Sequence, residues 1–187
     1  MQRRNFLQNT LTALAATTVA IPSFSQKQTP QKKGFKVKGL ATRYKEPIIY
    51  GETPIDFKLL SSDTEDRLSV FVSTNNQKGF GPPLHVHHTF DEFFCVLEGI
   101  FLFQLGDEML PLDKGDTLFI PRNVKHCFTY NGETSGTLLV GITPAKRMEN
   151  FFADMGKQLN VHGMPDMVAL QAIYKSYNSE ILGPPMK

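Results

Sequence analysis

Residues with metal-binding side chains are concentrated in one short stretch of the chain. The stretch begins at a turn rich in glycine and proline, residues 79–83, and ends in a hydrophobic run that closes at Gly99. Between them lie three histidines and two carboxylates: His85, His87, His88, Asp91 and Glu92. Imidazole and carboxylate groups suit transition metals, and such a cluster is a poor way to build a hydrophobic core. The stretch therefore predicts a metal site.

Strand geometry separates these side chains into two sets. Side chains alternate between the faces of a strand, so His85 and His87 point the same way, about 6.6 Å apart in rise. His88 has the opposite parity, and we expect it to be structural or exposed to solvent. A turn after His87 would let a neighbouring strand bring a carboxylate back to the imidazoles. We prefer Glu92 to Asp91 for this role because its parity matches that of inward-facing apolar positions. Taken alone, a His-x-His pair also has a structural explanation.

The composition is that of a globular domain with a balanced charge. The 187 residues are 41% hydrophobic and include 15 Phe, which is enough for one core. The formal net charge of +2 comes from Arg3 and Arg4, because the rest of the chain has equal numbers of basic and acidic residues. This balance disfavours nucleic acid and an anionic membrane surface as partners. Cys95 and Cys127 lie in apolar runs and are expected to be free thiols.

Residues 1–25 have the pattern of an export signal. The pair Arg3-Arg4, followed by Asn, Phe and Leu, resembles the twin-arginine signature, and the apolar run at 10–21 is too short to span a bilayer stably. We expect the segment to be removed on export to the periplasm or beyond, leaving no membrane partner; an uncleaved basic anchor is the alternative. Residues 26–34 are predicted to be a flexible spacer. Lysines in place of Arg3 and Arg4 should block export by this route.

The next part of the chain, residues 35–145, predicts an all-β domain. Short apolar segments rich in Val, Ile, Phe and Thr recur there between Gly, Pro, Asn and Asp residues, which is typical of a sandwich or barrel. Gly106-Asp107 and residues 113–116 are hairpin signals. The predicted strands are 35–40, 47–50, 55–60, 68–73, 84–87, 92–97, 100–105, 117–120, 124–130 and 137–143.

Residues 146–187 predict a helical extension after this domain. Apolar residues recur at helical spacing over 148–159, and a second such run, with Tyr174 in it, follows Asp166. The sequence Gly183-Pro-Pro prevents further helix. We expect the two helices to pack on the outside of the β domain; a mobile lid across its mouth is the alternative.

The metal-binding stretch resembles the first motif of the cupin family, G-x5-H-x-H-x4-E-x6-G. Every interval of that motif is matched by Gly79, His85, His87, Glu92 and Gly99.

A second cupin motif, G-x5-P-x-G-x2-H-x3-N, is similar to the segment with Gly115, Pro121 and His126. Asn123 replaces the family's glycine, which is a mild change because asparagine tolerates a left-handed turn. Tyr130 replaces the final asparagine, which affects a structural position near a strand end. The resemblance covers about residues 45–145 and implies a single jelly-roll β-barrel, followed here by the two helices.

The cupin resemblance implies that His85, His87, Glu92 and His126 hold one metal ion inside the barrel. This ligand set suits a divalent transition metal: Fe, Mn, Ni, Cu, Co or Zn. Four protein ligands leave one or two positions for water, substrate or O2, as in catalytic sites. Cys127 has the opposite strand parity to His126 and should point away from the metal.

Phenylalanines predicted to lie near these ligands suggest an apolar cavity, although each has ordinary core packing as its simplest role. They are Phe90, Phe94, Phe101, Phe103, Phe119 and Phe128. An apolar cavity favours an aromatic or otherwise apolar small molecule as substrate. Cupin barrels commonly associate through edge strands, so the resemblance also implies a homodimer formed through the segment before Tyr50.

Residues 82–99, the two helices and the C-terminal sequence resemble, more weakly, the small cupins described as quercetin dioxygenase-like. This implies an exported dioxygenase acting on a small aromatic or enolic compound, with Glu92 both as a ligand and as the catalytic proton acceptor. Cupins have many functions, so a non-catalytic metal- or ligand-binding protein and a sugar or keto-acid isomerase stay open. An isomerase would need basic residues in the barrel, and neither Arg122 nor Lys125 is convincingly inward.

Overall fold

The computed structural model describes residues 33–39, 41–74, 78–162 and 166–186. The chain divides into two units, residues 1–35 and 36–187, and all the helices and strands described belong to the second. The predicted export signal and most of the predicted spacer lie outside the described residues, so both stay predictions. None of the helices in the described part of the chain is long and apolar enough to cross a membrane.

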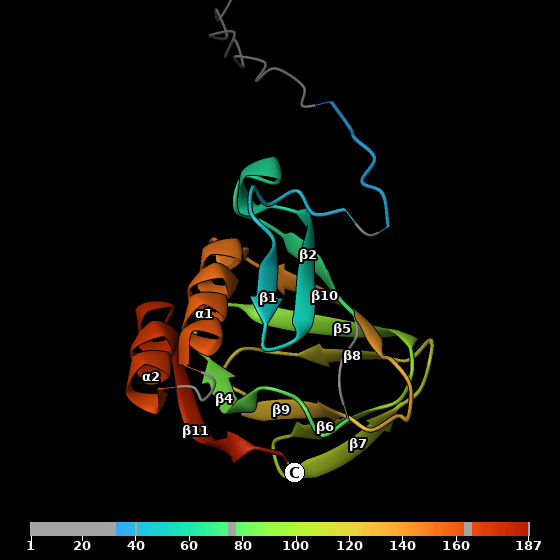
Figure 1. The fold of residues 1–187 in the computed structure, drawn as a ribbon, viewed down its shortest axis with the longest axis vertical. Coiled ribbons are helices and arrows are strands. Elements are labelled where there is room, and N and C mark those ends of the chain that lie inside the picture. The colour runs from blue at the N-terminus through green and yellow to red at the C-terminus, as the bar shows by residue number, and fades with distance from the viewer. Residues whose placement is uncertain (1–32, 40, 75–77, 163–165, 187) are drawn as a thin grey trace, which may run out of the picture. The chain divides into compact units, whose positions relative to one another are not determined.

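Two antiparallel sheets form the β domain, which confirms the all-β prediction (Figure 1). The six-stranded sheet has the order β1-β2-β3-β10-β5-β8, and the five-stranded sheet has the order β11-β4-β9-β6-β7. The strands of the first sheet are β1 (Ile48–Tyr50), β2 (Thr53–Leu59), β3 (Ser69–Ser73), β5 (Asp91–Glu98), β8 (Thr117–Ile120) and β10 (Thr137–Thr143). Those of the second are β4 (Pro83–His87), β6 (Phe101–Leu105), β7 (Glu108–Leu112), β9 (His126–Tyr130) and β11 (Ser179–Pro185).

The predicted barrel is an open jelly-roll sandwich, because the strand pairings of the described residues build two separate sheets. Alternating side chains of each strand fill the space between them. In β5, for example, Glu92, Phe94 and Val96 are buried, whereas the residues between them are only half-buried. The inward parity predicted for Glu92 is thus confirmed. A cluster of Phe, Ile, Leu and Val side chains from both sheets forms the core.

Three predictions about the strands were wrong. Residues 35–39 contain no strand. The turn at residues 113–116 is not a hairpin, because it leads from β7 in one sheet to β8 in the other. The C-terminal extension is not only helical, because β11 follows its helices and pairs with β4. Gly106-Asp107 does connect a hairpin, between β6 and β7. The apolar pattern of the sequence indicated neither β7 nor β11.

Two helices follow the last strand of the six-stranded sheet, as predicted. They are α1 (Met148–His162) and α2 (Met167–Ser176), and a short 3-10 turn, η1 (Ser61–Asp63), lies between β2 and β3. Asp166 caps α2, since its carboxylate accepts hydrogen bonds from the backbone N–H groups of Val168 and Ala169. The helices pack against each other, α1 contacts β1, and α2 contacts β11, so both lie beside the same part of the sandwich (Figure 1).

Candidate metal centre

Three histidines of the five-stranded sheet converge on one point. His85 and His87 lie on β4 with one residue between them, and His126, the first residue of β9, is directly opposite His85 in the ladder. The imidazole centroids are 4.3 Å apart for His85 and His126, and 4.7 Å apart for His85 and His87. All three side chains are at most 5% exposed.

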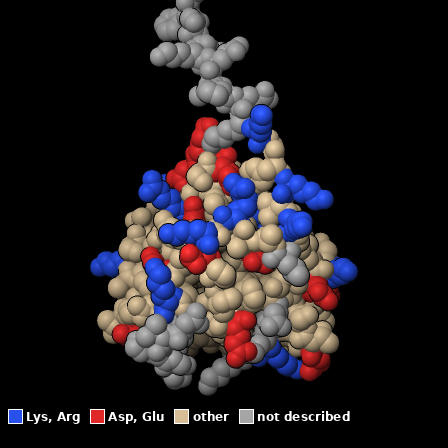
Figure 2. All heavy atoms as spheres, turned by 45° about the horizontal axis from the view of Figure 1, so that its top comes forward, with Lys and Arg blue, Asp and Glu red and all other residues tan. Residues whose placement is uncertain are grey.

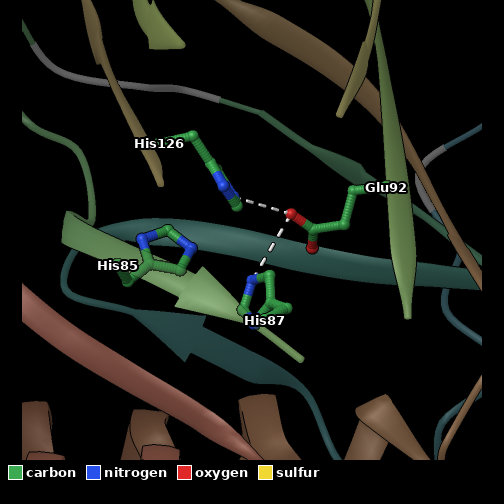
Figure 3. A group of neighbouring side chains, drawn as sticks. All are labelled: His85, His87, Glu92 and His126. Atoms are coloured by element: carbon green, nitrogen blue, oxygen red, sulfur yellow. Dashed lines mark hydrogen bonds and ion pairs between the residues drawn. The ribbon is translucent and has the colours of Figure 1, made fainter. Parts of the chain in front are cut away.

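The carboxylate of Glu92 reaches the same point from the opposite sheet (Figure 3). Its Oε2 lies 3.0 Å from Nε2 of His126 and 3.5 Å from Nε2 of His87. The next strand along the chain does return this carboxylate, as expected, but it does so from the facing sheet, because β4 and β5 are not paired with each other. The site spans the interior of the sandwich, so its geometry depends on how the two sheets pack.

Hydrogen bonds inside the protein orient each imidazole. The Nδ1 atoms of His85 and His126 lie 2.7 Å from the Pro83 carbonyl and 2.9 Å from the Val124 carbonyl. Nδ1 of His87 lies 2.7 Å from the hydroxyl oxygen of Ser179, which itself donates to the Tyr177 carbonyl. Nδ1 must therefore carry the proton in each ring, which leaves the Nε2 lone pairs for the shared centre.

The contact between His126 and Glu92 is favourable only if a cation lies between them. With its proton on Nδ1, a neutral His126 presents an acceptor Nε2 to the carboxylate, which is also an acceptor. One proton shared between them, or one metal ion bound by both, makes this contact favourable. The four residues each offer one ligand atom within 4.8 Å of the others. Bonds of about 2.1 Å to one ion place ligand atoms about 3 to 4.2 Å apart, so the set fits a divalent metal with small adjustments.

The electrostatics of the cluster favour the protonation states that bind metal. Burial lowers the pKa of His85 well below its usual value, and His126 and His87 lower it further. Burial also lowers the pKa of His87, although Glu92 opposes this. For Glu92 burial alone would raise the pKa, but the facing imidazoles of His87 and His126 outweigh it and lower the pKa. Neutral His85 and His87 and an ionised Glu92 are the ligand forms that a cation needs.

The residues set aside on parity lie away from the centre. His88 is exposed, and its Nδ1 lies 2.8 Å from the side-chain oxygen of Asn123. Asn123 itself has a φ of 67°, the left-handed turn expected at this position. Asp91 forms a bidentate ion pair with Arg122, with contacts of 2.8 and 3.0 Å. Lys125 likewise points outward, to Asp107.

Both cysteines are free thiols, as predicted. The Sγ atom of Cys127 lies 3.7 Å from the side-chain oxygen of Gln104, and Cys127 is not among the clustered ligands. Burial raises the pKa of this thiol. The cysteine beside His126 is therefore part of the core and not a further ligand.

Three of the candidate ligands, His85, His87 and Glu92, line an apolar cavity of about 700 Å³, a volume that includes its opening to solvent. Aromatic and aliphatic side chains form most of the lining. The sheets supply Tyr50, Ile55, Phe71, Phe94, Phe128 and Val140, and the loop before β4 supplies Phe80. The helices supply Met148, Phe151, Phe152, Met155 and Tyr174. The predicted apolar cavity is therefore present.

The sequence was a poor guide to which side chains line this cavity. Of the six phenylalanines expected there, only Phe94 and Phe128 line it. Phe101 and Phe103 are buried in the core, and Phe119 is 58% exposed. Phe90 stacks on His87 with ring centroids 4.2 Å apart and so supports a candidate ligand.

The two helices have a larger role than the expected packing on the outside of the β domain. Their apolar stripes form one wall of the cavity, and Tyr174 of α2 contacts His85 edge-on, with centroids 5.5 Å apart. The helical periodicity correctly indicated which face of α2 is buried. It could not show that this face meets the metal cluster, because that contact is tertiary.

Comparison with known proteins identifies the part of the chain that carries the cluster. Residues 73–142, from the end of β3 almost to the end of β10, match the sequence profile of the family described as Cupin domain. This part of the chain is therefore similar to a cupin domain. The match includes all four candidate ligands and therefore supports the cupin resemblance found in the sequence. Within the matched residues, β4 and β9 supply the histidines, and β5 supplies the carboxylate.

Individual relatives share smaller parts of the chain. An uncharacterised protein of Methanocaldococcus jannaschii is 42% identical over 43 residues, which cover 23% of this chain and 34% of that protein. The chain thus matches about a third of that relative's length. Among solved structures, a predicted oxalate decarboxylase of Thermotoga maritima has a TM-score of 0.48 and 21% identity, covering 52% of this chain and 90% of its own. KdgF of a Halomonas species has a TM-score of 0.44 and 18% identity, covering 49% and 78%.

Proposed function

We propose that this cupin is a metal-dependent dioxygenase of small aromatic or enolic compounds. The observation that carries the proposal is the position of the four-residue cluster, three of whose members line a cavity rich in aromatic side chains. Such a cavity favours a flat, apolar ligand over a bare sugar. The weaker resemblance of the sequence to quercetin dioxygenase-like cupins supports the same reaction class.

His85, His87 and His126 would hold the metal through Nε2, and Glu92 would hold it through its carboxylate. The donor set suits divalent Fe, Mn, Ni, Co, Cu or Zn. When bound, the ion supplies a Lewis acid with coordination positions beyond the four protein ligands. The hydrogen bonds of the Nδ1 atoms fix the orientation of the three rings, so the Nε2 atoms are already in position before a metal binds.

The remaining steps depend on the chain's own residues. Glu92 is the carboxylate of the cavity wall nearest to the histidines, so it can accept the hydroxyl proton of an enol or phenol placed against them. Phe71, Phe94 and Phe128 keep water from the bound compound.

The cavity argues against the isomerase alternative. Arg and Lys are absent from the described residues that line it, so nothing there would bind a phosphate or carboxylate group of a sugar or keto acid through a cation. A non-catalytic metal- or ligand-binding cupin uses the same ligands and the same cavity. It differs from the enzyme only in leaving the bound compound chemically unchanged.

Oxygen consumption tests the proposal. Protein loaded separately with each candidate metal is mixed with flavonols, catechols and 1,3-diketones, and dissolved O2 is followed with an electrode. We expect uptake with at least one redox-active metal, and loss of most of that rate in Glu92→Gln, because amide nitrogen and oxygen accept a proton poorly. Zinc-loaded protein should be inactive.

Absence of uptake with every combination would overturn the dioxygenase proposal and would favour the binding protein. Uptake that persists in Glu92→Gln would remove the proton-accepting role from this residue.

A further inference from the structure

Two tyrosine hydroxyls of the cavity have no hydrogen-bond partner in the described part of the chain. Tyr50 ends β1 and Tyr174 lies in α2, so they come from segments far apart in the sequence, and both line the cavity. A phenol can donate one hydrogen bond and accept others, and leaving it unpaired in an apolar site costs free energy. Unpaired hydroxyls facing a cavity therefore point to a polar group of a ligand.

Tyr174 is held in a fixed position beside the metal cluster. Its side chain is 2% exposed, and its ring packs edge-on against His85 at 5.5 Å and against Phe151 at 5.1 Å. Burial raises its pKa, and Tyr50 and Glu92 lie close enough to contribute to the same shift. Tyr174 is thus a cavity-lining phenol in direct contact with a candidate ligand ring.

The wall around Tyr50 contains a further unpaired hydroxyl. Thr53 pairs with Tyr50 across the β1–β2 turn and lines the cavity, and its Oγ1 is buried without a partner among the described residues. The ring of Tyr50 packs edge-on against Phe80 at 5.7 Å, which restricts its movement. Thr53 thus places a second hydroxyl beside Tyr50 in a largely apolar cavity.

We infer that Tyr174 and Tyr50 donate hydrogen bonds to an oxygen atom of the ligand that lies beside the metal cluster. The ligand class that fits is an aromatic or enolic compound with an anionic or carbonyl oxygen, its ring against the phenylalanines and its oxygen toward the two phenols. The inference rests on one part of the proposed function, the binding of the ligand next to the metal. It does not depend on a reaction with O2.

Binding of 4-nitrocatechol to zinc-loaded protein tests this inference without catalysis, because its visible absorbance reports both binding and ionisation. We expect Tyr174→Phe to weaken binding about tenfold, the effect of one hydrogen bond to a charged oxygen, and to shift the absorbance of the bound compound. Tyr50→Phe should have a smaller effect in the same direction. Imidazole binds metals but offers no oxygen, so its affinity should be the same in all variants.

Two matched substitutions serve as controls. Tyr130→Phe alters a buried tyrosine that does not line the cavity, and Tyr177→Phe alters a half-buried one that also lies outside the lining. Neither should change the affinity for 4-nitrocatechol. Equal losses in the controls, equal losses of imidazole affinity, or no binding of 4-nitrocatechol to the unmodified zinc-loaded protein would each overturn the inference.

The outcome separates this inference from the dioxygenase proposal. If the tyrosines control 4-nitrocatechol binding but no compound supports oxygen uptake, the inference stands and the dioxygenase proposal fails. If oxygen uptake is found and neither Tyr→Phe variant changes binding, the dioxygenase proposal stands and the inference fails.

Discussion

Ser179 shows how a residue outside the metal motif can control the site. Its hydroxyl accepts the Nδ1 proton of His87 at 2.7 Å, donates to the Tyr177 carbonyl, and is 4% exposed. His85 and His126 use backbone carbonyls for the same purpose, which no side-chain substitution removes. Among the described residues, Ser179 is therefore the only side chain that accepts a hydrogen bond from Nδ1 of one of the three rings. Its contribution can be tested directly by substitution.

We predict that Ser179→Ala lowers zinc affinity about tenfold, because His87 loses the hydrogen bond that fixes its tautomer and orientation. Competition with a chromophoric chelator measures this. Ser176→Ala is the matched control, since the Ser176 hydroxyl is exposed and donates to the Ile173 carbonyl of its own helix. Equal affinities of Ser179→Ala and the unmodified protein would show that Ser179 does not support the ligand.

At the scale of the elements, the sequence predicted the positions of the metal-binding residues better than the strands and side chains around them. Strand alternation and motif spacing placed His85, His87 and Glu92 correctly, because both depend on local geometry and on intervals along the chain. The strand β11, which supplies Ser179, was missed because Gly183 and the prolines after it hide its alternating pattern. The sequence also did not indicate which residues of the strands and helices line the cavity, because only tertiary packing brings them together.

The junction of β1 with the helices gives a pH prediction. Burial raises the pKa of Tyr50 above its usual value of about 10. A group whose folded-state pKa is raised stabilises the fold below its unfolded-state pKa, and this contribution is lost as the pH rises above about 10. Stability should therefore fall on the alkaline side as the unfolded chain releases the Tyr50 proton.

We expect Tyr50→Phe to show a flatter decline of the urea midpoint between about pH 9 and 11 than the unmodified protein. Urea unfolding in the presence of a chelator, repeated at several pH values, measures this. Parallel declines in the two proteins would show that the Tyr50 phenol is not protected from ionisation in the folded state.

At the scale of the whole molecule, the two sheets and the two helices together build one site. The five-stranded sheet supplies three imidazoles, the six-stranded sheet supplies a carboxylate, and the helices close the apolar cavity beside them. On the face shown in Figure 2, basic and acidic side chains are interspersed rather than segregated. Export through residues 1–25 and association through the edge strand β1 stay predictions, testable by cell fractionation and by light scattering.

Metal content tests the central claim most directly. Protein purified without added metal, and again after loading and desalting, is analysed by mass spectrometry of the elements. We predict one divalent transition metal per chain in the loaded protein, a large loss of metal in His126→Ala, and full retention in His88→Ala, because His88 is exposed and outside the cluster. No stable metal in the unmodified protein, or equal losses in the two variants, would contradict the assignment of this cluster as a metal centre.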